Sequence, residues 1–350
     1  MFLLPKDGWR YFPGIPPTGL HVAPWRKEAV QRWLRPLLPG WGRGRSPALW
    51  HSTNQMTKYL PLDARVPVLL TIHDLNFLHE TGADERPRDR ARKLADVQRR
   101  VDRAAAIVTD SRWVAADVAR HVDLGGRPVH VVPLGVAAPL PAAAARPAFL
   151  PPGPFLLTVG NALPHKNFHV LLDLVKAEPG TRLVIAGKKS TPYGDHLQRL
   201  VAERGLGGRV IMPGEVSDGD RQWLYERCEA FFFPSLTEGF GFPMLEAMQC
   251  GRPVFCSRRT SLPEIAADLG EYLDAYDGPA LAAAYRAGMA RFHADPHRGA
   301  ALRRHAASFS WAATARGYAD VYASLLGVEP TVAERTDEPA IGIPPLRRAC

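Results

Sequence analysis

The chain has 350 residues, 46% of them hydrophobic, which is enough for two globular domains with sizeable cores. No apolar run reaches the roughly 18 residues that a membrane span requires, and Met1–Pro5 is too short for a signal peptide, so the sequence predicts a cytoplasmic protein. The four cysteines form neither a Cys-x-x-Cys pair nor a metal-ligand spacing, which argues against a zinc site and a disulfide framework.

The net charge of +9 lies entirely in the first half of the chain. Residues 1–150 contain 22 Lys and Arg against 13 Asp and Glu, whereas residues 151–350 contain 22 of each. The first 60 residues also carry Trp9, Trp25, Trp33, Trp41 and Trp50. Basic residues interleaved with tryptophans suit an anionic membrane surface or a phosphorylated acceptor, and a solvated basic surface explains the charge equally well. No recognised nucleic-acid motif accompanies the charge, so we expect no nucleic-acid partner.

Four short apolar runs in the first half predict strands, at Ala48–Ser52, Val66–Ile72, Ala105–Val108 and Val129–Val132. Arg- and Ala-rich stretches at about 88–103 and 112–121 predict helices between them. Residues 137–153 are rich in Ala and Pro and lack hydrophobic periodicity, which is typical of a linker. We therefore expect an N-terminal domain over residues 1–136.

Strands and helices alternate more cleanly after the linker. The expected strands are Phe155–Val159, Arg182–Ala186, Arg209–Met212, Ala230–Phe233 and Pro253–Cys256, and the expected helices are about 167–177, 194–204, 218–228 and 243–249. This alternation predicts a parallel sheet with helices on both faces, so the chain is expected to be an α/β protein of two Rossmann-like domains, the second at 154–309. A last helix at 310–326, from Ser310 to near Gly327, is expected to pack back on the N-terminal domain, and residues 327–350 to form a flexible tail.

The first of two candidate ligand loops runs from Gly160 to Asn167, directly after a predicted strand. Ligands of open parallel sheets bind beyond the carboxyl ends of the strands. Gly160 lets the backbone turn tightly, and Lys166 stands near the start of a helix, where it can meet a phosphate. Taken alone, a strand-to-helix turn with a surface lysine explains this loop equally simply.

The second candidate loop runs from Pro234 to Phe242 and enters a helix at Pro243. Gly239 and Gly241 expose backbone N–H groups, and the helix start adds partial positive charge, which together suit a diphosphate or sugar hydroxyls. Glu238 and Glu246 can both reach the same crevice, and a carboxylate is a good acceptor for a ribose diol. The alternative is that both glutamates only favour the start of the helix.

Three polar groups follow predicted strands of the first domain. His73 and Asp74 end the strand at Val66–Ile72, so they belong in a crevice by the same rule. His51 and Asn54 are candidates for an acceptor side, with loop capping as the alternative. Asp110-Ser111 stands before a helix and is better interpreted as its N-cap.

An ordered series of segments resembles family 4 of the retaining glycosyltransferases, also described as glycosyl transferases group 1. The series is TVGNALPHKN (158–167), RLVIAGK (182–188), VIMPGEVSD (210–218), FFFPSLTEGFGFPMLEAMQCGRPV (231–254) and SLPEI (261–265). Two glutamates separated by seven residues are the signature of that family, and embedded in this series the pair is specific. TIHDLNFLHE (71–80) and the closing FSWAATARGYADVYASLL (309–326) extend the resemblance over most of residues 48–326.

The resemblance implies the GT-B fold, in which two Rossmann-like domains enclose a cleft. It assigns His73, Glu238 and Lys166 to the catalytic site, with His73 facing the donor sugar across the cleft and Lys166 neutralising the donor diphosphate. Glu246 would hold the ribose, Glu238 and the amides of Phe240 and Gly241 would sit against the sugar, and Val216 would lie near the base. The donor loops add Gly160, Asn161, His165 and Gly239 to the binding residues.

The implied activity is retaining transfer of a hexose such as mannose or glucose from a GDP- or UDP-linked sugar to a glycan or lipid-linked acceptor, in bacterial-type polysaccharide assembly. No metal or cofactor is required, and the leaving group departs from the front face without a protein nucleophile. A dinucleotide-dependent dehydrogenase is a poor alternative, because no Gly-x-Gly-x-x-Gly follows a strand.

Two departures from the family pattern motivate a second hypothesis. Asn161 and His165 stand where many members have arginine, so that either stabilisation of the leaving group is weaker or Lys188 or Lys189 assists it. Residues 1–47 lack the hydrophobic strand and glycine-rich loop with which members usually begin, so we expect the true start to lie upstream; an in-frame stop codon there would contradict this. The alternative function is a catalytically impaired subunit that binds nucleotide sugars or a partner.

Overall fold

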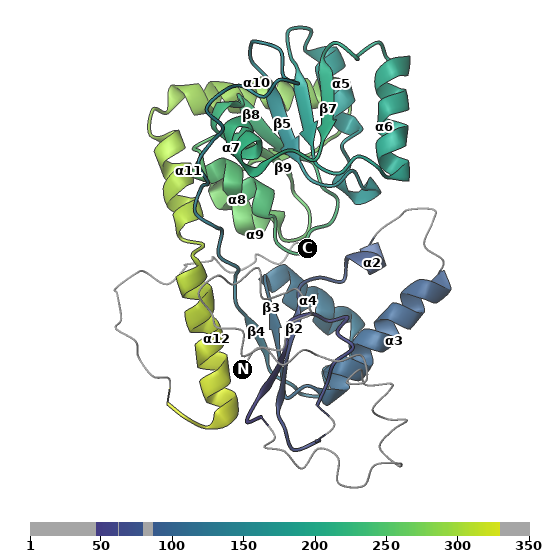
Figure 1. The fold of residues 1–350 in the computed structure, drawn as a ribbon, viewed down its shortest axis with the longest axis vertical. Coiled ribbons are helices and arrows are strands. Elements are labelled where there is room, and N and C mark those ends of the chain that lie inside the picture. The colour runs from purple at the N-terminus through teal and green to yellow at the C-terminus, as the bar shows by residue number, and fades with distance from the viewer. Residues whose placement is uncertain (1–46, 62, 80–86, 330–350) are drawn as a thin grey trace.

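The computed structural model describes residues 47–61, 63–79 and 87–329. Two parallel sheets, each covered by helices, lie one beyond the other along the long axis of the molecule (Figure 1). Most of the basic, tryptophan-rich opening, the proposed missing first strand and nearly all of the expected tail lie outside the described residues. Among the helices of the described part, none is both long and apolar enough to cross a membrane.

The first sheet has four parallel strands in the order β1-β2-β3-β4. They are β1 (Trp50–Ser52), β2 (Val68–Ile72), β3 (Ala106–Thr109) and β4 (Val129–Val131), joined by α2 (Asn76–His79), α3 (Pro87–Arg103) and α4 (Arg112–His121). All residues of β2 and β3 are buried, as their unbroken apolar runs predict for central strands. Each of the four predicted strands is present, shifted by two residues at most.

The second sheet has six parallel strands in the order β10-β9-β8-β5-β6-β7. The strands are β5 (Leu156–Val159), β6 (Leu183–Ala186), β7 (Val210–Gly214), β8 (Ala230–Phe233), β9 (Val254–Ser257) and β10 (Glu271–Leu273). The helices are α5 (Val170–Ala177), α6 (Pro192–Glu203), α7 (Asp218–Arg227), α8 (Phe242–Gln249), α9 (Leu262–Ala266), α10 (Gly278–Ala294) and α11 (Arg298–Ala307). The α/β prediction of two Rossmann-like parallel sheets is confirmed, while β10 and α9–α11 lie beyond the elements expected from the sequence.

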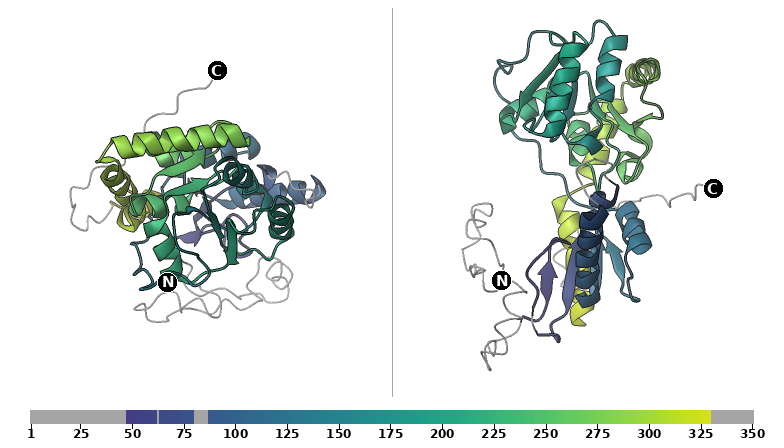
Figure 2. Two further views of the ribbon diagram at one scale, coloured as in Figure 1. Left: turned by 90° about the horizontal axis from the view of Figure 1, so that it is seen from above. Right: turned by 90° about the vertical axis from the view of Figure 1, so that its right-hand side faces the viewer.

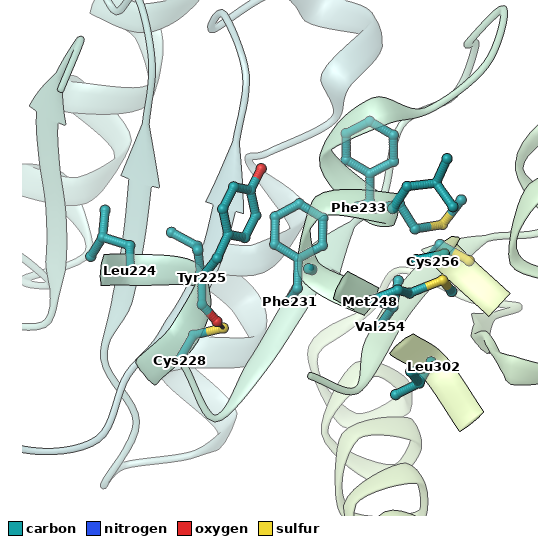
Figure 3. Packing of buried hydrophobic residues seen from close by; sticks show 14 of the residues in the cluster. Leu224, Tyr225, Cys228, Phe231, Phe233, Met248, Val254, Cys256 and Leu302 are labelled. Atoms are coloured by element: carbon teal, nitrogen blue, oxygen red, sulfur yellow. Dashed lines mark hydrogen bonds between the residues drawn. The ribbon is translucent and has the colours of Figure 1, made fainter. Parts of the chain in front are cut away.

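Alternate side chains of the second sheet enter two separate cores, as a strand's period of two requires. Phe231 and Phe233 point to the face covered by α7, α8 and α11, whereas Phe232 and Phe255 stack on the opposite face at 4.7 Å between ring centroids. Figure 3 shows the first of these cores, where Tyr225 of α7 lies beside Phe231. An apolar layer on both faces fixes the register of the central strands, and with it the positions of the loops that follow them.

The order of strands reverses between β5 and β8, which are adjacent in the sheet although they are separated in sequence by β6 and β7. In a doubly wound sheet such a reversal opens a crevice beyond the carboxyl ends of the two strands. The loop after β5 contains Lys166 and the loop after β8 contains Glu238, so both candidate loops meet at this point.

Local signals at the helix ends agree with the predicted boundaries, with one exception. The side chain of Ser217 accepts a hydrogen bond from the Asp220 amide at the start of α7. The helix predicted from residue 167 instead begins at Val170, because a 3-10 turn, Pro164–Lys166, comes first. Asn167 closes that turn in the left-handed conformation, with φ of 57°, which an asparagine tolerates better than most residues.

The helix α12 (Trp311–Leu326) lies along the first sheet rather than the second (Figures 1 and 2). Ser310 caps its start and Gly327, at φ of 64°, ends it. Val321 of α12 packs into the core formed by Leu69, Val108 and Val132. This face of the first sheet is therefore covered by α12, which follows the whole second domain in sequence.

Candidate active site

The loop after β5 brings Lys166 over the end of β8. Its Nζ lies 2.5 Å from Oε1 of Glu238 and 5.3 Å from the centroid of the Phe233 ring. The two charged side chains are only 14% and 12% exposed. The carbonyl of His165 also accepts a hydrogen bond from the amide of Leu236 at 2.7 Å, so the two loops are joined through backbone as well as side chains.

The loop after β8 is held in place by hydroxyl groups of the segment that follows β9. Oγ1 of Thr260 accepts a hydrogen bond from the Glu238 amide at 3.1 Å, and Oγ of Ser261 lies 2.9 Å from the Glu238 carbonyl. Gly241 then starts α8 at φ of 122°, a conformation that side chains rarely adopt. The loop thus presents the Glu238 carboxylate and the start of α8 from a fixed backbone.

Glu246 lies in α8, partly exposed, next to the buried Tyr225 of α7. Burial is the main cause that raises the pKa of the Tyr225 hydroxyl, and the neighbouring Glu246 carboxylate adds to it. By distance and angle, the buried Tyr225 hydroxyl has no hydrogen-bond partner among the described residues, so it is a neighbour of Glu246 rather than a donor to it. The sequence does not predict this neighbour, because a helical tyrosine is indistinguishable from an ordinary core residue.

His73, at the end of β2, has both ring nitrogens close to oxygen atoms. Its Nδ1 lies 2.7 Å from Oδ2 of Asp110, and its Nε2 lies 2.8 Å from the Thr53 carbonyl. The hydrogen bond to Asp110 is the main cause that raises the pKa of His73, against the opposing effect of burial. Burial in turn raises the pKa of Asp110. Both shifts favour a proton held between these two side chains.

The two domains touch where the β8 loop meets the end of β2. A Cβ atom on Gly239 would lie 2.3 Å from the His73 carbonyl oxygen, so only glycine permits this approach. Oγ of Ser111 donates to the Gly239 carbonyl at 3.0 Å, and Oγ1 of Thr237 donates to Oδ1 of Asn76 at 2.7 Å. The structure thereby places His73 and Glu238, predicted from different domains, on opposite sides of one junction.

A carboxylate of the second domain also caps a helix of the first. The two side-chain oxygens of Glu264, in α9, accept hydrogen bonds from the amides of Arg112 and Trp113 at 2.9 and 3.2 Å. Ser111 caps the same helix from within, as predicted for the Asp110-Ser111 pair, while Asp110 itself turns to His73. Glu264 belongs to the SLPEI segment, but the sequence gives no sign that its partner lies in the other domain.

The remaining predicted binding residues lie around these loops. Asn161 is exposed, Val216 is partly buried at the end of β7, and Phe240 turns its side chain into the core against Phe309. Gly160, at φ of 153°, has its carbonyl so close to Gly187 that a Cβ there would lie 2.2 Å from the oxygen.

The two lysines after β6 have different surroundings. Lys188 is exposed, whereas Nζ of Lys189 donates to the Met212 carbonyl at 2.6 Å. An open hollow of about 340 Å³ beside Lys189 is lined by Thr191, Pro192 and Gln198 at the start of α6. Its lining residues belong to the loop after β6 and the start of α6, and Oγ1 of Thr191 donates to the Ala162 carbonyl in the loop after β5.

His51 and Asn54, the candidates for an acceptor side, have structural partners. His51 is held between the hydroxyls of Tyr322 and Thr71, at 2.7 and 2.8 Å. Oδ1 of Asn54 accepts from the Met56 amide at 2.7 Å, which agrees with loop capping. Neither side chain reaches the junction at Gly239 through a described contact.

Within the residues that the structure describes, no three His, Cys, Asp or Glu side chains gather in a group suited to a metal ion. The site instead brings together an ion pair, two glycine-containing loops and a helix start at the switch point of a parallel sheet. These features are typical of a site for an anionic ligand, and it lies where two Rossmann-like domains touch.

Comparison with known proteins gives the class of fold. The structure resembles sucrose-phosphate synthase from Thermosynechococcus elongatus with a TM-score of 0.67 and 22% identity, over 90% of this chain and 82% of the other. It resembles Anabaena HepE, in complex with UDP-glucose, with a TM-score of 0.64 and 19% identity over 79% of each chain. The fold is GT-B, as expected.

Sequence relatives place the chain more closely. Residues 145–297 match the family described as glycosyl transferases group 1. O-antigen chain mannosyltransferase B of Escherichia coli is 31% identical over 267 residues, covering 72% of this chain and 68% of its own length. D-inositol 3-phosphate glycosyltransferase of Segniliparus rotundus is 27% identical over 282 residues, covering 75% of this chain and 62% of its own length. The chain belongs to the glycosyl transferases group 1 family.

Proposed function

We propose that this glycosyltransferase moves a hexose, mannose in the first instance, from a GDP- or UDP-linked sugar to a glycan or lipid-linked acceptor, with retention of configuration and without a metal ion. The observation that carries the proposal is the ion pair of Lys166 and Glu238 where the loops after β5 and β8 meet, beside the approach of Gly239 to His73. Mannose is favoured because O-antigen chain mannosyltransferase B, which is 31% identical over 72% of this chain, is a mannosyltransferase by name.

Charge on the leaving diphosphate is met in this proposal by Lys166, by loop amides and by the positive end of the α8 dipole. Lys166 pairs with Glu238, which in this proposal sits where the sugar would lie, so the lysine stands next to the bond that breaks. We expect positive charge on the sugar carbon to develop as the diphosphate leaves, without a covalent glycosyl-enzyme intermediate.

Two variants test the assignment. Lys166→Ala should lower turnover by roughly 100- to 1,000-fold, as loss of a group that stabilises developing charge does. Glu246→Gln should weaken donor binding by about 10-fold or more, because it removes a charged acceptor. The measurements are radiolabelled transfer and calorimetric titration with GDP-mannose and UDP-glucose.

Exposed residues of the same types serve as controls: Lys176→Ala in α5 and Glu203→Gln in α6 should match the unmodified protein. Full activity in both site variants would contradict the proposal. Binding of a nucleotide sugar without transfer and without slow hydrolysis would favour the alternative, a catalytically impaired subunit. Asn161, exposed and in the place of the family's usual arginine, is one reason for considering it. Product NMR tests retention, and activity in excess EDTA tests independence from metal.

We also propose that the basic first half contacts an anionic membrane surface at the cytoplasmic side. Among the described residues, Arg88, Arg92 and Arg99 of α3 are exposed. Salt-sensitive sedimentation with phosphatidylglycerol vesicles, but not with neutral vesicles, is the expected result.

A further inference from the structure

The pair of His73 and Asp110 joins the carboxyl ends of three strands. Thr53 follows β1, His73 follows β2 and Asp110 follows β3, and the ring of His73 contacts the other two at 2.8 and 2.7 Å. Only 3% of the Asp110 side chain is exposed. The ring is therefore fixed by the first domain before any ligand arrives.

The protonation state of His73 follows from its partners. A carbonyl oxygen can only accept a hydrogen bond, so the Nε2 that faces Thr53 carries a proton. Nδ1 faces a carboxylate, which holds a second proton between the two side chains. With both nitrogens engaged, the ring is a bracket between the three strand ends and has no free nitrogen for proton transfer to a substrate; it is a cation when the second proton resides on Nδ1.

The bracket continues into the contact between the domains. The carbonyl of His73 is the group that Gly239 approaches, and Ser111, next to Asp110, donates to the Gly239 carbonyl. The backbone at His73 and the backbone at Gly239, which flank the proposed sugar site, are thus both in contact with the segments that carry the His73–Asp110 pair. Besides Asp110, the charged or titratable groups that act on His73 are Asp74 on the same loop and His51 on β1.

We propose that Asp110 is a positioning residue for the transfer reaction: it fixes the His73 ring as a cation, and through it sets the backbone that faces Gly239 and the sugar. The inference rests on the proposed function for its catalytic consequence. The pairing itself is a property of the protein alone and can be measured without a substrate.

Asp110→Asn is the informative substitution, because asparagine keeps the shape and one acceptor oxygen but loses the charge. The pKa of His73, raised by Asp110 in the unmodified protein, should fall in this variant. In sugar transfer, kcat should fall about 10- to 100-fold, because a small displacement of His73 from its position beside the sugar slows the reaction. The KM for the donor should stay within about twofold. The alkaline limb of the pH profile should move to lower pH, because His73 loses its proton earlier.

The titration is followed by NMR of histidine rings labelled with ¹³C, with the His73 signal identified by its loss in His73→Gln. Asp117→Asn is the matched control: Asp117 lies on α4 and is also 3% exposed, and its Oδ2 is 2.8 Å from Nε2 of His79. This variant should leave the His73 titration and kcat unchanged. In the double variant of His73→Gln with Asp110→Asn, kcat should be no lower than in His73→Gln alone.

An unchanged His73 titration in Asp110→Asn overturns the pairing. A shifted titration with unchanged kcat overturns the positioning role. If Asp110→Asn does not fold, half-protonation of His73 at or below pH 6.5 in the unmodified protein overturns the proposal. If the unmodified protein transfers no sugar, the proposed function fails, and the NMR titration still decides whether the pair exists.

Discussion

The absence of one side chain at position 239 determines how closely the two domains approach. Gly239 does not have a positive φ, so an alanine there would suit its own backbone. The obstacle is the other domain, since the added Cβ would lie 2.3 Å from the His73 carbonyl oxygen and 3.1 Å from Cβ of Asp74. A glycine needed for approach, rather than for its own conformation, marks a site where two surfaces must meet.

Gly239→Ala should therefore reduce sugar transfer by about 100-fold, and donor binding much less, because the domains cannot close to the geometry seen here. Calorimetry with the donor and a transfer assay give the two quantities. Gly207→Ala is the control, since a Cβ there meets nothing within 4 Å. Equal transfer rates in the two variants would show that this contact is dispensable.

Single residues also mark the limit of what the sequence predicts. Glu238 and Glu246 lie in one continuous segment, so their spacing predicts that they share a crevice. His73 and Asp110 are 37 positions apart and on different loops, and only the order of strands in the first sheet brings them together. The sequence favours a helix cap for Asp110, because that local role is common for aspartate. In the structure Ser111 alone caps α4.

Among the elements, α12 and β1 depend on each other through His51. The ring lies between Tyr322 and Thr71 and packs against Tyr318 at 5.1 Å between ring centroids. Burial, with repulsion from His73, lowers the pKa of His51 to about 4. In the unfolded chain this histidine has its usual value of 6.5, so it gains a proton there before it does so in the folded protein.

The sign of the resulting pH dependence follows directly. Between pH 6.5 and 4 the unfolded state binds more protons at His51, so the folded protein loses stability as the pH falls through this window. From pH 7 to pH 5 the loss from this one group should be about 2 kcal/mol. His51→Gln should remove that part of the loss, as measured by urea unfolding at the two pH values.

His297→Gln, at an exposed position before α11, should retain the full pH dependence of the unmodified protein. Parallel behaviour of His51→Gln and the unmodified protein would mean that His51 is not held neutral by α12.

The sequence predicts the boundaries of most elements within three residues, because apolar runs and caps are local signals. The additional helices α9–α11 are not among the expected elements, although Leu281, Tyr285 and Met289 of α10 recur at helical spacing and pack into one core.

At the scale of the whole molecule, Glu264 connects the two domains by capping α4 from across the junction. Burial raises the pKa of Glu264, and the two amide hydrogen bonds oppose that shift. A helix cap is typically worth about 1 kcal/mol. Here that free energy favours the approach of one domain to the other, rather than the stability of a single helix alone.

Glu264→Ala should lower the fraction of molecules in which the two domains touch as they do here. The amides of Arg112 and Trp113 should then exchange hydrogen faster, and the radius of gyration in solution should increase. Asp277→Ala is the comparison, because Asp277 caps α10 within one domain by accepting from the Ala280 amide at 2.9 Å. It should reduce thermal stability to a similar extent without either of these changes. Identical exchange at Arg112 in both variants would contradict a connecting role for Glu264.

The position of α12 affects the order in which the protein can fold during synthesis. Its residues cover one face of the first sheet, yet they follow the whole of the second domain in the chain. Domains usually complete folding from the N-terminus as the ribosome releases them. In this chain the second domain is complete before α12 is made, so the first domain keeps one apolar face uncovered until α12 has been translated. We therefore expect the nascent chain to need protection from aggregation at this face for longer than within the second domain.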